Sequence, residues 1–260
     1  MNKFLTIISL STLLFASCDK TEDNITLAEI EGKATVTFDA VVGTTDFALD
    51  KDFTANAKTW KFSQLRYWVS NVVLVNASGT EVAIPNSYYL IEENKAVPTN
   101  SDFVYPANKR ETVTLSDIPA GDYKSIKFSV GVPERFNNNL SLQAGELSQL
   151  NGMTNISWMW ATSYIFSSLK GTVTEGATTK TLMVETGLNA NFKKVALNLP
   201  GTIHIGSNKS TAIVVNTDVA KITDGVDIMA TPSVGASQST VMAAVANNYS
   251  SKVFTVKLAQ

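Results

Sequence analysis

The feature that most constrains the fold is a long series of short strand-like segments separated by turn residues. Residues 33–43, 66–84, 87–93 and 121–132 alternate in polarity or are rich in β-branched and aromatic side chains. Similar segments continue to the C-terminus, and such segments are typical of β-strands. Many short strands with almost no helix favour two packed sheets over a parallel α/β sheet. We therefore predict an all-β fold, a two-sheet antiparallel β-sandwich of the Ig-like or Greek-key type.

Turn and helix signals fit the same architecture. Gly79 in "NASGTE" and Gly176 in "TEGATTK" stand where a hairpin needs a residue with positive φ. Residues 235–249 predict one short helix near the C-terminus, with Ser237 or Ser239 as its N-cap. The polar stretch 137–155 is expected to be a loop containing one helical turn. No linker is visible after Gly32, so residues 33–260 are expected to form one domain.

The N-terminal residues are expected to be a targeting segment. Residues 1–17 carry a charged start and a short apolar run, which predicts a secretory signal peptide. Small residues before Cys18, the only cysteine, resemble the lipobox of bacterial lipoproteins, where this cysteine is acylated, for example with palmitate. The alternative is a plain cleaved signal peptide. Residues 18–32 have the composition of an acidic tether, and Lys20, Glu22 and Asp23 resemble the export signal of Bacteroidota lipoproteins. We expect a lipid-anchored outer-membrane protein, facing the periplasm or the cell surface.

Composition excludes several classes of function. The 21 Lys and Arg residues are dispersed and are outnumbered by 23 Asp and Glu residues, which argues against a nucleic-acid partner. One histidine and one cysteine leave no histidine triad, zinc cluster or haem site, so an enzyme is not expected. Ser167 and Lys170 have the spacing of a Ser-x-x-Lys motif, but in a strand they would face opposite ways. Three acids in "TDFALDKDF" are more typical of a solvated loop than of a calcium site.

The segment "WMWATSYIFSSLKG" is strongly apolar on both faces of a strand. Under period-two alternation, one face carries Trp158, Trp160, Tyr164 and Phe166, and the opposite face carries Met159, Ala161, Ile165 and Leu169. A strand with two apolar faces has to be covered on both. We predict that it lies at the centre of the sandwich with a layer on each side.

Four segments together resemble one family. "LRYWVSNVVLV", "DIPAGDYKSIKFSVGV", "NGMTNISWMWATSYIFSSLKG" and "IVVNTDVAKI" occur in the order typical of the MbnP-like family of secreted, copper-associated β-sandwich proteins. The resemblance extends from Val36 to Ile222. It implies copper bound through histidines, and a tryptophan that a di-haem, cytochrome c peroxidase-like partner of the MauG type oxidises to kynurenine. Trp158 and Trp160 are the candidate oxidised residues, although core packing is the alternative for both.

The metal ligands do not carry over. The family's two histidine positions correspond to Ala40 and Glu185, so both imidazoles are replaced, and copper favours imidazole and soft sulfur. The single histidine, His204, lies between two isoleucines and is more typical of a half-buried or edge residue. Met153 and Met159 could supply thioethers, but methionine in an aromatic strand usually packs. The remaining metal candidates are therefore Glu185, His204 and Met159.

Three hypotheses of function follow. The first is an envelope-anchored MbnP-like lipoprotein that binds copper or is the partner or substrate of a MauG-type oxidase, with a degenerate metal site. The second is a surface-exposed glycan-binding or protein-binding lipoprotein without metal. Its candidate stacking residues are Trp60, Trp68, Tyr88 and Tyr89, of which alternation places at least half in the core. The third is a structural envelope protein.

Overall fold

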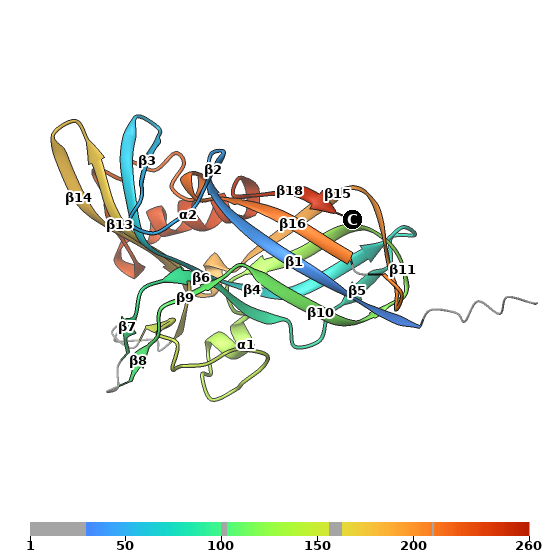
Figure 1. Ribbon diagram of the computed structural model, residues 1–260. Coiled ribbons are helices and arrows are strands. Elements are labelled where there is room, and N and C mark those ends of the chain that lie inside the picture. The colour runs from blue at the N-terminus through green and yellow to red at the C-terminus, as the bar shows by residue number, and fades with distance from the viewer. Residues whose placement is uncertain (1–29, 100–102, 156–162, 210, 260) are drawn as a thin grey trace, which may run out of the picture.

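The computed structural model describes residues 30–99, 103–155, 163–209 and 211–259, and two mixed sheets form its body (Figure 1). The predictions for Cys18, Trp158, Met159 and Trp160 fall outside these ranges. The sheets pack face to face with a short helix against them, so the all-β sandwich prediction is confirmed. Among the described residues, no helix is both long and apolar enough to cross a membrane.

The smaller sheet has the strand order β10–β1–β16–β18, with β2 paired to β1. Its strands are β1 (Glu31–Val42), β2 (Thr45–Asp46), β10 (Thr112–Pro119), β16 (Thr211–Asp218) and β18 (Phe254–Ala259). β1 and β16 run parallel, in register from Ala34 opposite Thr211 to Val41 opposite Asp218. The predicted antiparallel pairing holds for most neighbouring strands of the sandwich, but not for this pair. The chain builds most of the larger sheet before β16 returns beside β1, and such a long connection permits parallel pairing.

The larger sheet has the order β15–β11–β4–β13–β14–β17, and the long strand β4 lies inside it. These strands are β4 (Lys58–Asn76), β11 (Gly121–Val130), β13 (Ser163–Glu175), β14 (Thr178–Gly187), β15 (Lys193–Ile205) and β17 (Ser233–Val234). Short strands extend it: β3 (Asp52–Ala55), β5 (Glu81–Ala83), β6 (Tyr88–Asn94), β9 (Asn108–Arg110) and β12 (Thr154–Asn155). β7 (Val97–Pro98) and β8 (Val104–Tyr105) pair separately. β14 and β17 are also parallel.

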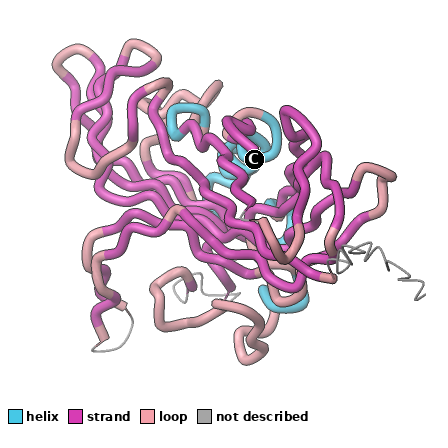
Figure 2. The backbone as a smooth tube through the Cα atoms, turned by 45° about the vertical axis from the view of Figure 1, so that its right-hand side comes forward, coloured by secondary structure: helices cyan, strands magenta, loops and turns pink. Residues whose placement is uncertain are grey.

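The predicted hairpin turns are present. β4 turns into β5 through Gly79, whose φ is 95°, and β13 turns into β14 through Gly176, whose φ is 57°. Positive φ is accessible to glycine at little cost, so these two residues fix the turns. The β3–β4 and β13–β14 hairpins project together from one end of the molecule (Figures 1 and 2).

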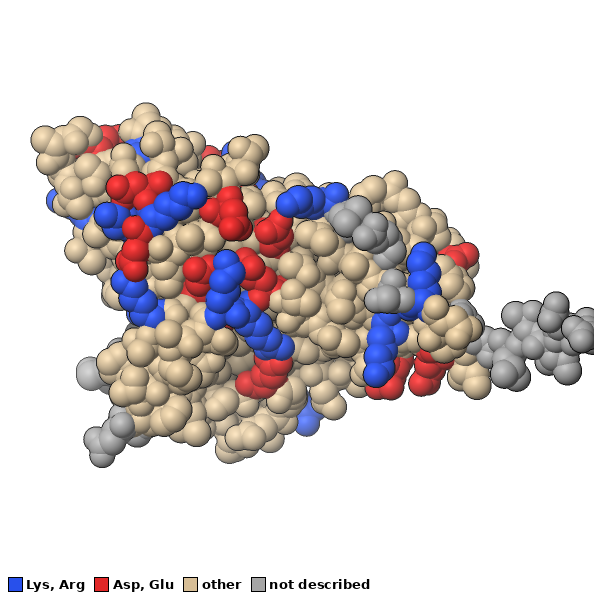
Figure 3. All heavy atoms as spheres, viewed as in Figure 1, with Lys and Arg blue, Asp and Glu red and all other residues tan. Residues whose placement is uncertain are grey.

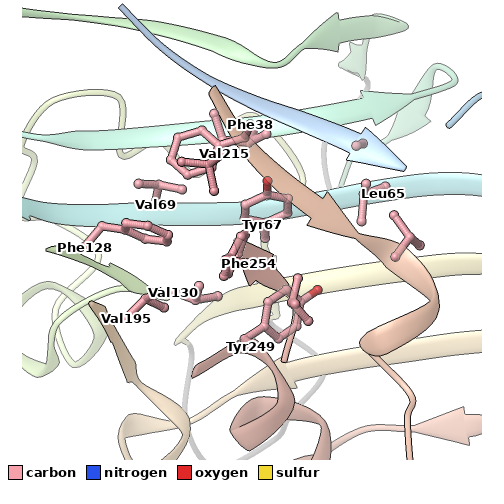
Figure 4. Packing of buried hydrophobic residues seen from close by; sticks show 14 of the residues in the cluster. Phe38, Leu65, Tyr67, Val69, Phe128, Val130, Val195, Val215, Tyr249 and Phe254 are labelled. Atoms are coloured by element: carbon pink, nitrogen blue, oxygen red, sulfur yellow. The ribbon is translucent and has the colours of Figure 1, made fainter. Parts of the chain in front are cut away.

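The main core lies between the two sheets. Phe38 of β1, Tyr67 of β4, Phe128 of β11 and Phe254 of β18 point toward one another, with Tyr249 beside them (Figure 4). Their rings meet mostly edge to face or tilted, for example Phe38 and Phe128 at 5.3 Å between centroids. Each such buried side chain contributes about 1.5–3 kcal/mol of transfer free energy. This cluster holds the two sheets together.

A second, smaller core covers the opposite face of the larger sheet, which we call the outer face. It contains Trp68 of β4 and Tyr164 and Phe166 of β13, covered by a segment that includes α1 (Glu134–Asn137). On the other face of β13, Leu169 packs in the main core, so the prediction of a doubly covered strand is confirmed. Ile165 was expected opposite Tyr164 but joins the same small cluster, because the pairing of β13 with β14 shifts between Ile165 and Ser167.

The predicted C-terminal helix is α2 (Ser239–Ser251), which packs against β14 and β15 through buried residues that include Met242 and Tyr249. Neither Ser237 nor Ser239 caps this helix through its side chain. The turn η3 (Ala236–Gln238) precedes the helix, and there the Gln238 side chain accepts from the Gly235 N–H. Two other 3₁₀ turns are η1 (Asn189–Asn191) and η2 (Val219–Lys221). Asp218 accepts from the Ala220 N–H and so caps η2.

Candidate functional site

A row of buried polar side chains crosses the outer face of the larger sheet. Arg66 of β4 lies opposite Glu92 of β6 on one side and Ser168 of β13 on the other. Ser168 in turn lies opposite Glu185 of β14. All four side chains are buried, although charged residues are rarely buried unless they are paired. We call these four residues the polar row.

Arg66 and Glu92 form a fully buried ion pair. Nε of Arg66 donates to Oε2 of Glu92 at 2.8 Å, and Nη2 lies 2.7 Å from the same oxygen. The other carboxylate oxygen, Oε1, accepts from the Tyr105 hydroxyl at 2.5 Å and from Nδ2 of Asn108 at 2.8 Å. Both charged side chains are only 1% exposed. Desolvation makes such a pair costly, and the hydrogen bonds to both carboxylate oxygens offset that cost.

Tyr105 joins this network through its ring and its hydroxyl. The Arg66 guanidinium lies over the Tyr105 ring, 4.8 Å from its centroid, which adds a cation–π contact. Burial and then the hydrogen bond to the negative Glu92 raise the pKa of Tyr105 to about 12. The phenol therefore stays protonated near neutral pH and acts as a hydrogen-bond donor.

Beside the pair lies a hollow of about 250 Å³, which we call the β6–β9 hollow. Its walls come from β6, β8, β9 and the loop 146–151. The polar lining is Glu92, Tyr105, Asn108, Arg110, Glu146, Ser148 and Asn151, and the apolar lining is Leu90, Phe103 and Leu150. Phe103 and Leu150 are large apolar side chains with exposed fractions of 45% and 61%. In Figure 1, β7 and β8 lie below the sheet, on the side away from α2.

Glu146 fastens the loop wall of this hollow to the sheet. Its carboxylate accepts from the Leu90 N–H at 3.1 Å and forms a two-pronged pair with the Arg110 guanidinium. Its own N–H donates to the Tyr88 carbonyl at 3.1 Å. The loop therefore occupies the β6 edge at Tyr88 and Leu90. Charge-assisted contacts of this kind give the wall a fixed position.

The two positions that correspond to the family's histidines lie in different layers. Ala40 is 4% exposed and packs in the main core, where its N–H is bound by Glu111. Glu185 follows the core residue Val184 and faces the outer side, where it accepts from Ser168 at 3.2 Å and pairs with Lys170 at 3.2 Å. Ala40 belongs to the smaller sheet and points into the core between the sheets, whereas Glu185 belongs to the larger sheet and points away from that core, so one ion cannot bind at both positions. No cluster of three His, Cys, Asp or Glu suited to a metal occurs among the described residues.

The other metal candidates are not brought to Glu185. His204 lies on the edge strand β15 and contacts Asp122 through Nδ1 at 2.8 Å, as a partly exposed edge residue. Three strands separate β15 from β14, so the spacing across the sheet is roughly 19 Å. Met153 is buried in the small core, and Ser167 and Lys170 face opposite ways as expected. In the acidic loop, Asp50 pairs with Lys95 and Asp52 with Lys61.

The aromatic residues proposed for sugar stacking are mostly inside. Trp60 and Trp68 are 3% and 0% exposed and belong to the two cores, so they cannot stack on an external ligand. Tyr88 and Tyr89 are half-buried. The expectation that at least half of the four are core residues is confirmed.

Sequence reasoning did not find the ion pair or the β6–β9 hollow. A signal was present, because Arg66 and Glu92 each interrupt an otherwise strand-like segment, in "LRYWV" and "YYLIEEN". Charges inside apolar strands indicate a buried pair. The sequence does not show which strand β6 pairs with or in which register, so it could not place Glu92 opposite Arg66.

Comparison with known proteins identifies the family. A family model described as MbnP matches residues 31–243. Among solved structures, MbnP from Methylosinus trichosporium is similar at 17% identity, over 75% of this chain and 78% of that chain, with a TM-score of 0.47. No curated protein gave a significant match. Because the family match spans most of the described fold, the chain belongs to the MbnP family.

Proposed function

We propose that this chain is an envelope-tethered, non-enzymatic binding protein of the MbnP family that works without the histidine copper site. Its ligand occupies the β6–β9 hollow. The lipid on Cys18 holds the chain at the outer membrane, and the acidic segment between Cys18 and the start of β1 at Glu31 tethers the sandwich to it. A buried lipid contributes about 0.8 kcal/mol per methylene, so several acyl chains would anchor the protein firmly.

The observation that carries the proposal is the position of Glu185. Its carboxylate is paired with Lys170 and bonded to Ser168, while Ala40 presents a methyl group to the main core. A copper ion at Glu185 would have to displace Lys170 and would gain a single hard oxygen ligand, which copper does not prefer. A histidine in place of Ala40 would point into the main core between the sheets, away from Glu185.

The surface charge agrees with a partner of no strong charge. On the face shown in Figure 3, acidic and basic side chains are interspersed. Several of them form ion pairs with exposed lysines, such as Lys257 with Asp39 and Lys109 with Glu93. That face therefore offers no extended basic patch to which a polyanion could bind, and no extended acidic patch for a polycation.

A metal panel tests the proposal. A ligand that prefers the folded state raises the unfolding midpoint in proportion to RT ln(1 + [L]/Kd). We expect Cu²⁺, Cu⁺, Zn²⁺ and Ca²⁺, each added in a modest excess over the purified protein, to leave the midpoint unchanged. A rise specific to copper would contradict the proposal and return the chain to the copper-binding members of the family.

Oxidation of Trp158 or Trp160 by a di-haem MauG-type partner remains a separate prediction, because both residues lie outside the described ranges. Intact mass after secretion decides it, since conversion of tryptophan to kynurenine changes the mass of the chain. An unmodified mass in cells that contain the oxidase would contradict it.

A further inference from the structure

The charges that line the β6–β9 hollow are compensated within the protein. Glu92 is paired with Arg66, and Glu146 with Arg110. Each carboxylate also accepts further hydrogen bonds, Glu92 from Tyr105 and Asn108 and Glu146 from the Leu90 N–H. A charged ligand would have to break one of these pairs or enter beside a like charge. The hollow therefore favours a neutral ligand.

Neutral hydrogen-bonding groups complete the polar lining. Asn108 uses one N–H for Glu92, and its amide carries a second N–H and an acceptor oxygen. Asn151 accepts from the Met153 N–H through Oδ1, and its amide nitrogen bears two N–H donors. The Ser148 hydroxyl accepts from the Leu150 N–H and can still donate. Closely spaced donors and acceptors of this kind suit a ligand with several hydroxyl groups.

The rim supplies an apolar counterpart. Phe103 and Leu150 line the hollow and are both substantially exposed. Val104, the neighbour of Phe103 in the chain, is 53% exposed but does not line the hollow. An aromatic ring beside hydroxyl and amide groups matches a molecule that has polar edges and a weakly polar C–H face.

Size and backbone geometry argue against two other kinds of neutral ligand, a drug-sized molecule and a peptide that adds as a strand. A volume of about 250 Å³ is below the roughly 300–1,000 Å³ of sites for drug-sized molecules, so the occupant is one small ring. A peptide that adds as a strand needs an open sheet edge. At Tyr88 and Leu90 the edge of β6 is already occupied by Glu146.

We propose that the β6–β9 hollow binds one neutral pyranose unit, free or at the end of a glycan, with Phe103 stacked on its C–H face and Asn108, Ser148 and Asn151 bonded to its hydroxyls. The inference rests on the proposed function, since it names the ligand class of the same hollow. A single ring in a shallow hollow is bound weakly, with a dissociation constant on the order of millimolar.

Chemical-shift mapping of the ¹⁵N-labelled protein tests the inference. The probes are the methyl pyranosides of glucose, galactose, mannose and N-acetylglucosamine, with glucuronic acid and glucosamine as charged counterparts. We expect at least one neutral glycoside to shift amides of residues 103–110 and 146–151, and the charged sugars to bind more weakly. Phe103→Ala should weaken binding by about tenfold, whereas the matched control Val104→Ala should leave it unchanged.

The spectra themselves show whether each variant is folded, and Leu150→Ala replaces Phe103→Ala if the latter is not. The inference is overturned if every neutral glycoside is silent, if the shifts lie elsewhere, if charged sugars bind equally well, or if the rim variants and Val104→Ala behave alike. Copper added to the same sample separates the two ideas. A copper response refutes the proposed function, while silence toward both copper and sugars refutes only the pyranose inference.

Discussion

Removing one half of the Arg66–Glu92 pair should cost far more stability than replacing both halves. Glu92→Gln leaves the Arg66 guanidinium, 1% exposed, without a counter-charge. It also turns an acceptor of bonds from Arg66, Tyr105 and Asn108 into a group that is half donor. Breaking a buried pair from one side costs about 3–5 kcal/mol. For a chain of this size, that lowers the midpoint of thermal unfolding by roughly 6–20 °C.

The double replacement Arg66→Met with Glu92→Leu should behave differently. Two apolar side chains of similar volume remove both desolvation costs, and Tyr105 is only half-buried, so its hydroxyl can turn to water. We expect the double variant to lie within about 1–2 kcal/mol of the natural protein. The coupling free energy from the four proteins should then be about 3 kcal/mol or more.

Urea unfolding of the natural protein, Arg66→Met, Glu92→Leu and the double variant measures the coupling, and Glu92→Gln beside them measures the loss of one charge, provided that the slope with denaturant stays constant. The reasoning is refuted if Glu92→Gln costs less than about 1 kcal/mol, since a truly desolvated charge cannot lose its partner so cheaply. It is equally refuted if the double variant loses as much as the two single variants together, because the two side chains would then act independently.

The remaining predictions concern pH, packing and the membrane anchor. The pKa of Tyr105 is raised in the folded state to about 12 from 10.0, so its contribution to stability is fully present below pH 10 and is lost as the pH rises toward 12. The free energy of unfolding of Tyr105→Phe should therefore fall less steeply with alkaline pH than that of the natural protein. An equal fall in both proteins would contradict the assignment. A Cβ at Gly171 would collide with the Lys61 carbonyl and lie 2.8 Å from Cα of Phe62, whereas one at Gly121, at the same φ of 157°, meets nothing within 4 Å. Chemical denaturation should show Gly171→Ala about 1–3 kcal/mol less stable than Gly121→Ala. Equal stabilities would contradict this reasoning, because the β4 backbone would then move aside at no cost. Cys18→Ser should abolish metabolic labelling with palmitate, and persistent label would place the acylation elsewhere.

Features set by local chemistry were predictable from the sequence. Gly79 and Gly176 mark their turns because only glycine enters the positive-φ region cheaply. The alternation of apolar residues around Tyr164 and Leu169 predicted a strand covered on both faces, because the direction of neighbouring side chains in a strand depends only on local sequence. The isoleucines beside His204 predicted a half-buried or edge residue, and the structure places it on the edge strand β15.

Features set by long-range pairing were not predictable. β1 and β16 pair in parallel across 176 positions, as the bond between Thr35 and Thr211 shows. Likewise, the polar row exists only because β6, β4, β13 and β14 adopt one register, and a shift by one residue would send Arg66 into the main core. The outward direction of Glu185 depends on the same registers, and the inward direction of Ala40 depends on the register of β1 with β16.

Calorimetric titration of the purified protein with copper, beside Glu185→His, tests the central claim most directly. The account predicts no heat of binding for the natural protein and at most weak binding for Glu185→His. One imidazole on the outer face gains no partner from Ala40, which lies in the other layer. Tight, stoichiometric copper binding by the natural protein would contradict the claim that this MbnP-family chain works without a metal.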